Sequence, residues 1–160
     1  GTTLIENALI KARTVYQLTG LPSLSDDTGL EVDALNGAPG VYTARYAGEN
    51  PTFEDNVNKM LLELKDVSDF KRIARFRTVL AFVNSDSELC EEGIIEGEIT
   101  KSVFGKDGFG YDPIFKPKNY SITFAEMSAE EKNRISHRAR ALVKMKKTIK
   151  KYFKNGDSIE

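Results

Sequence analysis

The first apolar residues of the chain recur at the spacing of an amphipathic helix. Thr3 followed by Glu6 is the pattern of a capping box, and Gly20 is suited to end a helix. The apolar positions between them follow one helical face: Leu4, Ile5, Ala8, Leu9, Ala12, Val15 and Tyr16. The pattern predicts that the chain opens with a helix that buries this face.

The segments that follow are typical of strands. Residues 21–25 form a short extended run, and residues 30–35 alternate apolar and acidic side chains, as a half-buried strand does. Residues 75–83 have the composition of a core strand, and residues 93–100 alternate again. We expect these segments to pair into a sheet.

Two further helices are indicated by their caps. Thr52 caps a helix whose apolar stripe consists of Phe53, Val57, Met60, Leu61 and Leu64. Ser128 and Glu131 form a second capping box, which opens a long helix. The inner face predicted for that helix is Ile135, Ala139, Leu142, Val143, Ile149 and Phe153. With no internal repeat and no linker, the pattern predicts one α/β domain over residues 1–160, with a sheet flanked by helices.

Charge and cysteine content narrow the classes of function. The 160 residues carry a formal net charge of -1, so we expect neither a nucleic-acid partner nor a membrane partner, since both demand a basic excess. A single cysteine, Cys90, cannot form an internal disulfide, and no apolar run is long enough to span a bilayer. These observations predict a cytoplasmic protein.

Asp26 and Asp27 are adjacent carboxylates, and like charges side by side ask for a compensating cation. Mg²⁺ takes oxygen ligands and often only one or two carboxylates, with phosphates and waters completing its shell. A carboxylate at that position can also accept a proton from an attacking water. The alternative is a turn, in which the aspartates cap backbone N–H groups and Gly29 supplies a positive φ.

A glycine-rich loop with aromatic residues spans residues 105–115. Its glycines allow a ligand to approach the backbone, and Phe109 and Tyr111 offer flat faces on which a purine can stack. Asp112 precedes Pro113 and is therefore held extended. The alternative is a tight hairpin whose aromatic residues pack in the core.

Basic residues gather at the start of the last predicted helix. Lys132, Ser136, the only histidine, His137, and Arg138 fall in its first turns, where a helix N-terminus already attracts anions. The alternative is a solvated basic face, and Lys11 in the first helix can likewise be read as an ordinary exposed lysine.

Taken together, these residues closely resemble the inosine triphosphate pyrophosphatase family, whose members act on non-standard purine nucleoside triphosphates. The similarity runs from about Glu6 to the end of the long helix, and its order and spacing are specific. The matching strings are Asn7-Ala8 to Lys11, Asp26-Asp27-Thr28-Gly29-Leu30, Gly37-Ala38-Pro39-Gly40-Val41-Tyr42, Gly108-Phe109-Gly110-Tyr111-Asp112-Pro113-Ile114-Phe115, Thr123-Phe124-Ala125-Glu126-Met127 and Ser136-His137-Arg138.

The resemblance implies Mg²⁺-dependent hydrolysis of inosine, deoxyinosine or xanthosine triphosphate to the monophosphate and pyrophosphate. It implies that Asp27 accepts the proton of the attacking water and, with Asp26, forms the metal site. Thr28 stands where the family often has serine and is expected to contact the substrate. The other substrate contacts implied are Lys11, Lys132 and Arg138 for phosphates or the base edge, Phe109, Gly110, Tyr111 and Asp112 for the base wall, and His137 with Arg138 closing that wall.

The family fold is an elongated mixed β-sheet flanked by helices, with two lobes and a central cleft, and its members are usually homodimers. This chain starts at the helix that normally follows a phosphate-binding strand–helix unit, so the resemblance implies an N-terminally truncated member. Two alternatives stay open: a truncated relative that binds purine nucleotides with little or no turnover, and a nucleotide-handling subunit that associates with a partner through an exposed edge.

Overall fold

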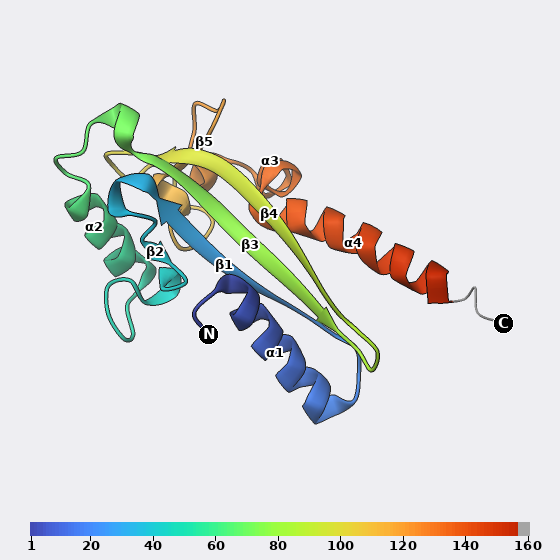
Figure 1. Cartoon of the computed structure of the whole chain (residues 1–160). Helices are drawn as coiled ribbons and strands as arrows, with labels where there is room; N and C mark the ends of the chain where they lie inside the picture. The colour runs from blue at the N-terminus through green and yellow to red at the C-terminus, as the bar shows by residue number, and fades with distance from the viewer. Residues whose placement is uncertain (157–160) are drawn as a thin grey trace. The chain divides into compact units, whose positions relative to one another are not determined.

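The computed structural model of the protein describes residues 1–156 and contains a five-stranded sheet with four α-helices in this range (Figure 1). The helices are α1 (Leu4–Thr19), α2 (Phe53–Glu63), α3 (Ala129–Ile135) and α4 (His137–Gly156). The strands are β1 (Ser23–Val32), β2 (Pro39–Gly40), β3 (Ile73–Val83), β4 (Glu88–Ile99) and β5 (Phe115–Pro117).

The strand order in the sheet is β2-β1-β3-β4-β5. Both edge strands pair antiparallel to their neighbours, with Leu30 opposite Gly40 at one edge and Gly97 opposite Pro117 at the other. β3 and β4 form a hairpin, in which the Asn84 side chain accepts hydrogen bonds from the backbone N–H groups of Asp86 and Ser87. A connection this short joins only antiparallel strands.

The chain divides into two units, each with its own packing. Unit 1 comprises Gly1–Thr28, Arg77–Ile94 and Ser136–Glu160, and unit 2 comprises Gly29–Phe76 and Ile95–Ile135. β1, β3 and β4 each contribute residues to both units. The single domain predicted over residues 1–160 stays a prediction, and residues 157–160 lie outside the described part of the chain.

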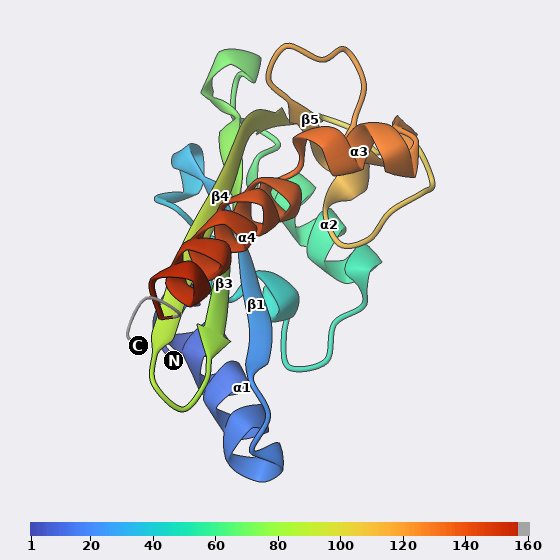
Figure 2. The same cartoon turned by 90° about the vertical axis from the view of Figure 1, so that its right-hand side faces the viewer.

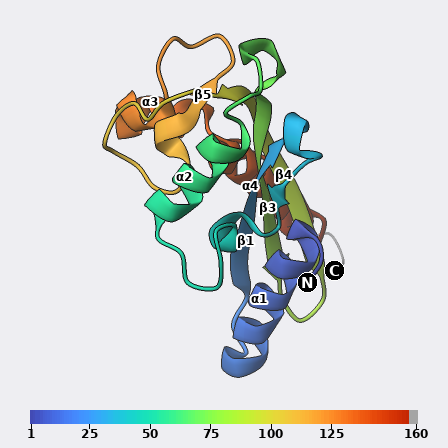
Figure 3. The ribbon, with the colours of Figure 1, turned by 90° about the vertical axis from the view of Figure 1, so that its left-hand side faces the viewer.

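In unit 1, α1 and α4 cover opposite faces of the strands. α4 lies in front of the strands in Figure 2, whereas α1 lies in front and α4 behind in Figure 3. Thr3 caps α1 as predicted, since its hydroxyl accepts from the Glu6 N–H, and Gly20 ends the helix in the left-handed conformation. The Glu6 carboxylate accepts from Thr2 instead of Thr3, so the predicted capping box is only half formed. The face of α4 that packs on Leu80 and Phe82 is Ala141 and Met145.

Two expectations for the second half of unit 1 were wrong. The long helix predicted from Ser128 is broken at Ser136, which is buried and whose hydroxyl accepts from the Ala139 N–H as the cap of a separate helix, α4. Leu142 and Val143, which were expected on the inner face, are exposed. The shift follows from the break, because the new cap restarts the helical phase.

Unit 2 packs around a cluster of aromatic rings. Phe115 lies 4.6 Å from Phe76 and 5.2 Å from Phe124, measured between ring centroids. Thr52 and Asp55 form a reciprocal capping box at the start of α2, which confirms the predicted cap. The buried Arg72 donates to the backbone carbonyls of Leu64 and Ile99, so it ties the end of α2 to the end of β4.

No helix within residues 1–156 combines the length and the apolar character that a membrane-spanning helix requires.

Candidate functional site

Asp26 and Asp27 lie in the middle of β1, so the turn interpretation of this pair is wrong. Successive side chains of a strand point to opposite faces. The two carboxylates therefore diverge, one toward α1 and the other toward α4, and each finds a cation there.

Asp27 is held by α1. Its Oδ1 atom forms an ion pair of 2.8 Å with Lys11 Nζ, and its Oδ2 atom accepts a hydrogen bond of 3.1 Å from the Asn7 amide. Asn7 and Lys11 are four residues apart and so share one helical face. Lys11 also donates to the Asp26 carbonyl, which fixes its ammonium at the backbone of β1. Lys11 is exposed, as the alternative interpretation has it, but its ammonium is paired with Asp27, and its contact with substrate stays a prediction.

Asp26 is held by α4. The Nε and Nη2 atoms of Arg138 lie 3.1 and 2.9 Å from Asp26 Oδ2. Both groups are partly exposed, so the pair is accessible to solvent. Arg138 is in the first turn of α4, which Ser136 caps. The break at Ser136 therefore places this guanidinium beside β1.

Gly93 in β4 makes the approach of α4 possible. A Cβ atom on Gly93 would lie 2.0 Å from the His137 carbonyl oxygen and 2.4 Å from the Ala141 nitrogen. Only a residue without a side chain fits this contact. Sequence reasoning missed Gly93, although a glycine inside an alternating strand is a known sign of a close backbone approach.

The other predicted residues of unit 1 are Thr28 and His137. Thr28 Oγ1 lies 2.6 Å from the hydroxyl of Thr78, a fully buried residue of β3. His137 is buried at the start of α4. Their substrate contacts stay predictions.

The side chains of unit 1 that are predicted to coordinate Mg²⁺ are the Asp26 and Asp27 carboxylates. Within residues 1–156, no three His, Cys, Asp or Glu side chains are grouped so that they could share one ion. Asp26 and Asp27 are neighbours in β1 and pair with different cations, and the magnesium site that they were expected to share stays a prediction. A single carboxylate with substrate phosphates and waters is a common Mg²⁺ environment, and Asp27 fits that environment.

In unit 2, the predicted base wall is built around the Asp112 carboxylate. Its Oδ2 atom accepts a 2.8 Å hydrogen bond from the Phe109 N–H and pairs with Lys132 Nζ. Gly108 has φ +82°, and a Cβ there would lie 2.2 Å from Asp112 Oδ2. The loop therefore closes on this carboxylate only because residue 108 is glycine.

Lys132 joins the wall from α3. Its side chain is 15% exposed and that of Asp112 is 3% exposed, so the ion pair is largely removed from water. Lys132 Nζ also lies 4.4 Å from the Phe109 ring centroid and 5.3 Å from that of Phe124. Lys132 does not belong to a solvated basic face, which was the alternative reading of this segment.

Phe109 and Tyr111 have different environments. Phe109 is 48% exposed, whereas Tyr111 is 2% exposed and donates a 2.9 Å hydrogen bond from its hydroxyl to the Thr43 carbonyl. Burial raises the pKa of the Tyr111 phenol. The ring of Tyr111 thus packs in the core, as the hairpin alternative has it, while Phe109 and Gly110 lie at the accessible part of the loop.

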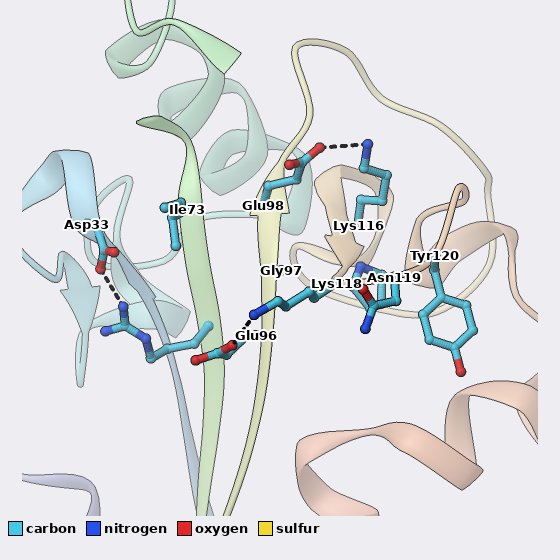
Figure 4. A pocket seen from close by; sticks show the side chains of 11 residues that line it. Asp33, Ile73, Glu96, Gly97, Glu98, Lys116, Lys118, Asn119 and Tyr120 are labelled. Carbon is cyan, nitrogen blue, oxygen red and sulfur yellow. Dashed lines mark hydrogen bonds and ion pairs between the residues drawn. The ribbon is translucent and has the colours of Figure 1, made fainter. Parts of the chain in front are cut away.

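A cavity of about 630 Å³ in unit 2 contains none of the predicted residues (Figure 4). Its charged side chains are matched in pairs, with Glu98 2.6 Å from Lys116, Glu96 3.3 Å from Lys118 and Arg75 2.5 Å from Asp33. Cross-strand pairs of this kind stabilise a sheet surface and leave no charge for a ligand.

Comparison with known proteins supports the resemblance. A profile of the Ham1 family matches residues 1–148. The chain belongs to the Ham1 family. A relative from Vibrio cholerae serotype O1 named dITP/XTP pyrophosphatase is 49% identical over 152 residues, which is 93% of this chain and 76% of the relative. A relative of the same name from Thermoanaerobacter pseudethanolicus is 52% identical over 151 residues, or 94% of this chain and 76% of the relative.

Comparison with solved structures confirms the α/β fold. The Ham1 protein of Staphylococcus aureus superposes with a TM-score of 0.89 at 38% identity, covering 95% of this chain and 79% of that protein. The nucleoside-triphosphatase / dITP/XTP pyrophosphatase of Mycobacterium abscessus superposes with a TM-score of 0.78 at 43% identity, covering 91% of this chain and 74% of that protein.

Proposed function

We propose that this Ham1 protein hydrolyses non-standard purine nucleoside triphosphates, namely inosine, deoxyinosine and xanthosine triphosphates, to the monophosphate and pyrophosphate. The names of the relatives from V. cholerae and T. pseudethanolicus support the substrate class. The observation that carries the proposal is the Asp27 carboxylate held between Lys11 and Asn7. It combines an acceptor for a water proton with a cation for a phosphate oxygen.

Asp27 acts as the general base in this proposal. Its carboxylate takes a proton from water as the water oxygen attacks phosphorus, and the bond to the departing pyrophosphate breaks. Asn7 orients the carboxylate through the hydrogen bond to Oδ2. Lys11, half-exposed beside Oδ1, can exchange this contact for a phosphate oxygen when a nucleotide binds.

Mg²⁺ is proposed as the cofactor, held by Asp27 and the substrate phosphates. When bound, it would neutralise phosphate charge and lower the pKa of a coordinated water.

Asp26 is proposed to position Arg138 instead of binding the metal. Its carboxylate fixes the Arg138 guanidinium, which carries donors suited to phosphate.

The wall in unit 2 is proposed to recognise the base. Phe109 supplies an accessible ring for stacking. Lys132, positioned by Asp112, is a donor that can face the 6-oxo group of hypoxanthine or xanthine. Adenine presents an amino group at that position, so it would leave a polar group unpaired and be rejected.

We also propose a homodimer and a cytoplasmic location, which the resemblance and the single cysteine suggest. Unit 1 exposes apolar side chains that a second copy of the chain could bury: Ile5, Ile10, Val15 and Leu18 on α1, Leu21, and Leu24 on β1.

The test is pyrophosphate release from inosine and xanthosine triphosphates compared with ATP and GTP, with and without Mg²⁺. The proposal expects release that requires the metal and is selective for the non-standard purines. Nucleotide binding without release would instead favour the binding protein that the sequence left open.

A further inference from the structure

The turn η2 (Thr43–Arg45) carries an arginine whose surroundings differ from those of every other arginine in the described chain. Arg13, Arg75, Arg77, Arg134 and Arg138 are ion-paired, and Arg72 and Arg140 donate to backbone carbonyls. Within residues 1–156, Arg45 has neither kind of partner. Its guanidinium carbon lies 5.1 Å from the centroid of the Tyr42 ring, and both side chains are exposed.

The backbone that presents Arg45 is fixed by several side chains. Thr43 Oγ1 donates to the Gly40 carbonyl at 2.6 Å and accepts from the Leu30 N–H at 2.8 Å. The buried Asn56 donates to the Ala44 carbonyl at 3.2 Å and accepts from the Ala47 N–H at 2.8 Å. The hydrogen bonds of Thr43 and Asn56 therefore fix the backbone from which Arg45 projects.

This turn is part of the same structure as the proposed base wall. Tyr111 belongs to the same loop as Phe109 and Asp112, and its core-facing side chain donates a hydrogen bond of 2.9 Å from the hydroxyl to the Thr43 carbonyl. Arg45 is therefore two residues along the chain from a contact with the loop that carries the wall, in the same unit. A guanidinium that stacks on an aromatic ring still has its N–H groups available as hydrogen-bond donors. Their planar arrangement suits two oxygens of a phosphate group.

We infer that Arg45, supported by the Tyr42 ring, is a substrate-binding residue that contacts the phosphate chain of the nucleoside triphosphate. This inference rests on the proposed function. It assigns unit 2 a phosphate contact in addition to the proposed base wall. The contribution of Arg45 to binding should therefore depend on the phosphates of the ligand, whereas that of Phe109 and Lys132 should depend on its base.

The test is equilibrium binding of inosine triphosphate, inosine monophosphate and inosine to Arg45→Ala, Arg45→Lys and the wild type. Loss of a charge-assisted hydrogen bond predicts that Arg45→Ala binds inosine triphosphate roughly 10- to 100-fold more weakly. Inosine affinity should not change. Arg45→Lys should fall between, because it keeps the charge and loses the fork.

Arg134→Ala is the matched control, since it removes an exposed, ion-paired arginine from the same unit and should bind inosine triphosphate as the wild type does. Unchanged triphosphate binding by Arg45→Ala overturns the inference and leaves the proposed function standing. An equal loss of triphosphate and inosine affinity also overturns it, because the residue would then support the wall rather than bind phosphate. A folded wild type that binds no inosine triphosphate overturns both.

Discussion

Asp26 and Asp27 are neighbours in the sequence, but their carboxylates are held by helices on opposite faces of β1. Asp27 pairs with Lys11 of α1 at 2.8 Å, and Asp26 pairs with Arg138 of α4 at 2.9 Å. The alternation of a strand gives each acid a separate environment. The two residues should therefore respond differently to the same substitution.

Asp27→Asn should abolish turnover and leave nucleotide binding largely intact, because it removes a base and little volume. Asp26→Asn is the matched variant, and it should weaken binding more than it slows the bound substrate, since it loosens Arg138. Initial rates and Kd values measured on both proteins separate the two roles. Near wild-type turnover by Asp27→Asn would exclude it as the general base.

Phe109→Ala should weaken the binding of purine triphosphates by roughly 1–3 kcal/mol if its ring stacks on the base. Phe70→Ala is the control, because Phe70 is another exposed ring of unit 2 with a lysine near its face. Isothermal titration with inosine triphosphate measures both. Equal affinities for Phe109→Ala and the wild type would return Phe109 to a packing role.

Lys132→Met should lower the free energy of unfolding by about 3–5 kcal/mol, because it leaves the buried Asp112 carboxylate without its cation. Lys101→Met breaks an exposed pair with Asp69 and should leave the free energy of unfolding nearly unchanged. Urea denaturation of the two variants gives the comparison. Equal costs would show that the Lys132–Asp112 pair is effectively solvated.

Gly93→Ala should lower the free energy of unfolding by about 1–3 kcal/mol, because its Cβ would meet the backbone of α4. The contact lies at the first turn of α4, which carries Arg138. We therefore also expect the substitution to displace Arg138 and so to weaken nucleotide binding. Gly20→Ala has open space around its Cβ and should change stability without changing binding. A Gly93→Ala protein with wild-type stability would refute the close approach.

Tyr111→Phe should cost about 1 kcal/mol of stability through the lost hydrogen bond to Thr43. Burial raises the pKa of Tyr111, so the unfolded chain, with a tyrosine pKa of about 10, loses this proton first. The stabilisation of the folded state by the protonated Tyr111 phenol is therefore complete below a pH of about 10. It declines as the pH rises through the pKa of Tyr111 in the folded protein. Melting curves between neutral and alkaline pH should show a smaller decline for Tyr111→Phe, and identical declines would contradict the assignment.

Local patterns in the sequence were sufficient to predict much of this fold. The caps at Thr3, Gly20 and Thr52 were confirmed, because capping depends on a few neighbouring residues. The continuous strand through Asp26 and Asp27 was not anticipated, since aspartate and glycine favour turns locally and only pairing within the sheet outweighs that preference.

The arrangement of the candidate site residues could not be predicted from their spacing along the chain. Lys132 and Arg138 were expected on one helix, and the cap at Ser136 assigns them to α3 and α4. A serine inside an apolar periodic segment does not by itself indicate a helix break. Gly93 and Thr78 act through contacts with residues distant in sequence, which spacing along the chain cannot reveal.

The most direct test of the proposed reaction is the identity of its products. ³¹P NMR of inosine triphosphate incubated with the protein and Mg²⁺ should show inosine monophosphate and pyrophosphate in equal amounts, with ATP left intact and no turnover by Asp27→Asn. Release of orthophosphate with inosine diphosphate, or equal hydrolysis of ATP, would contradict the account.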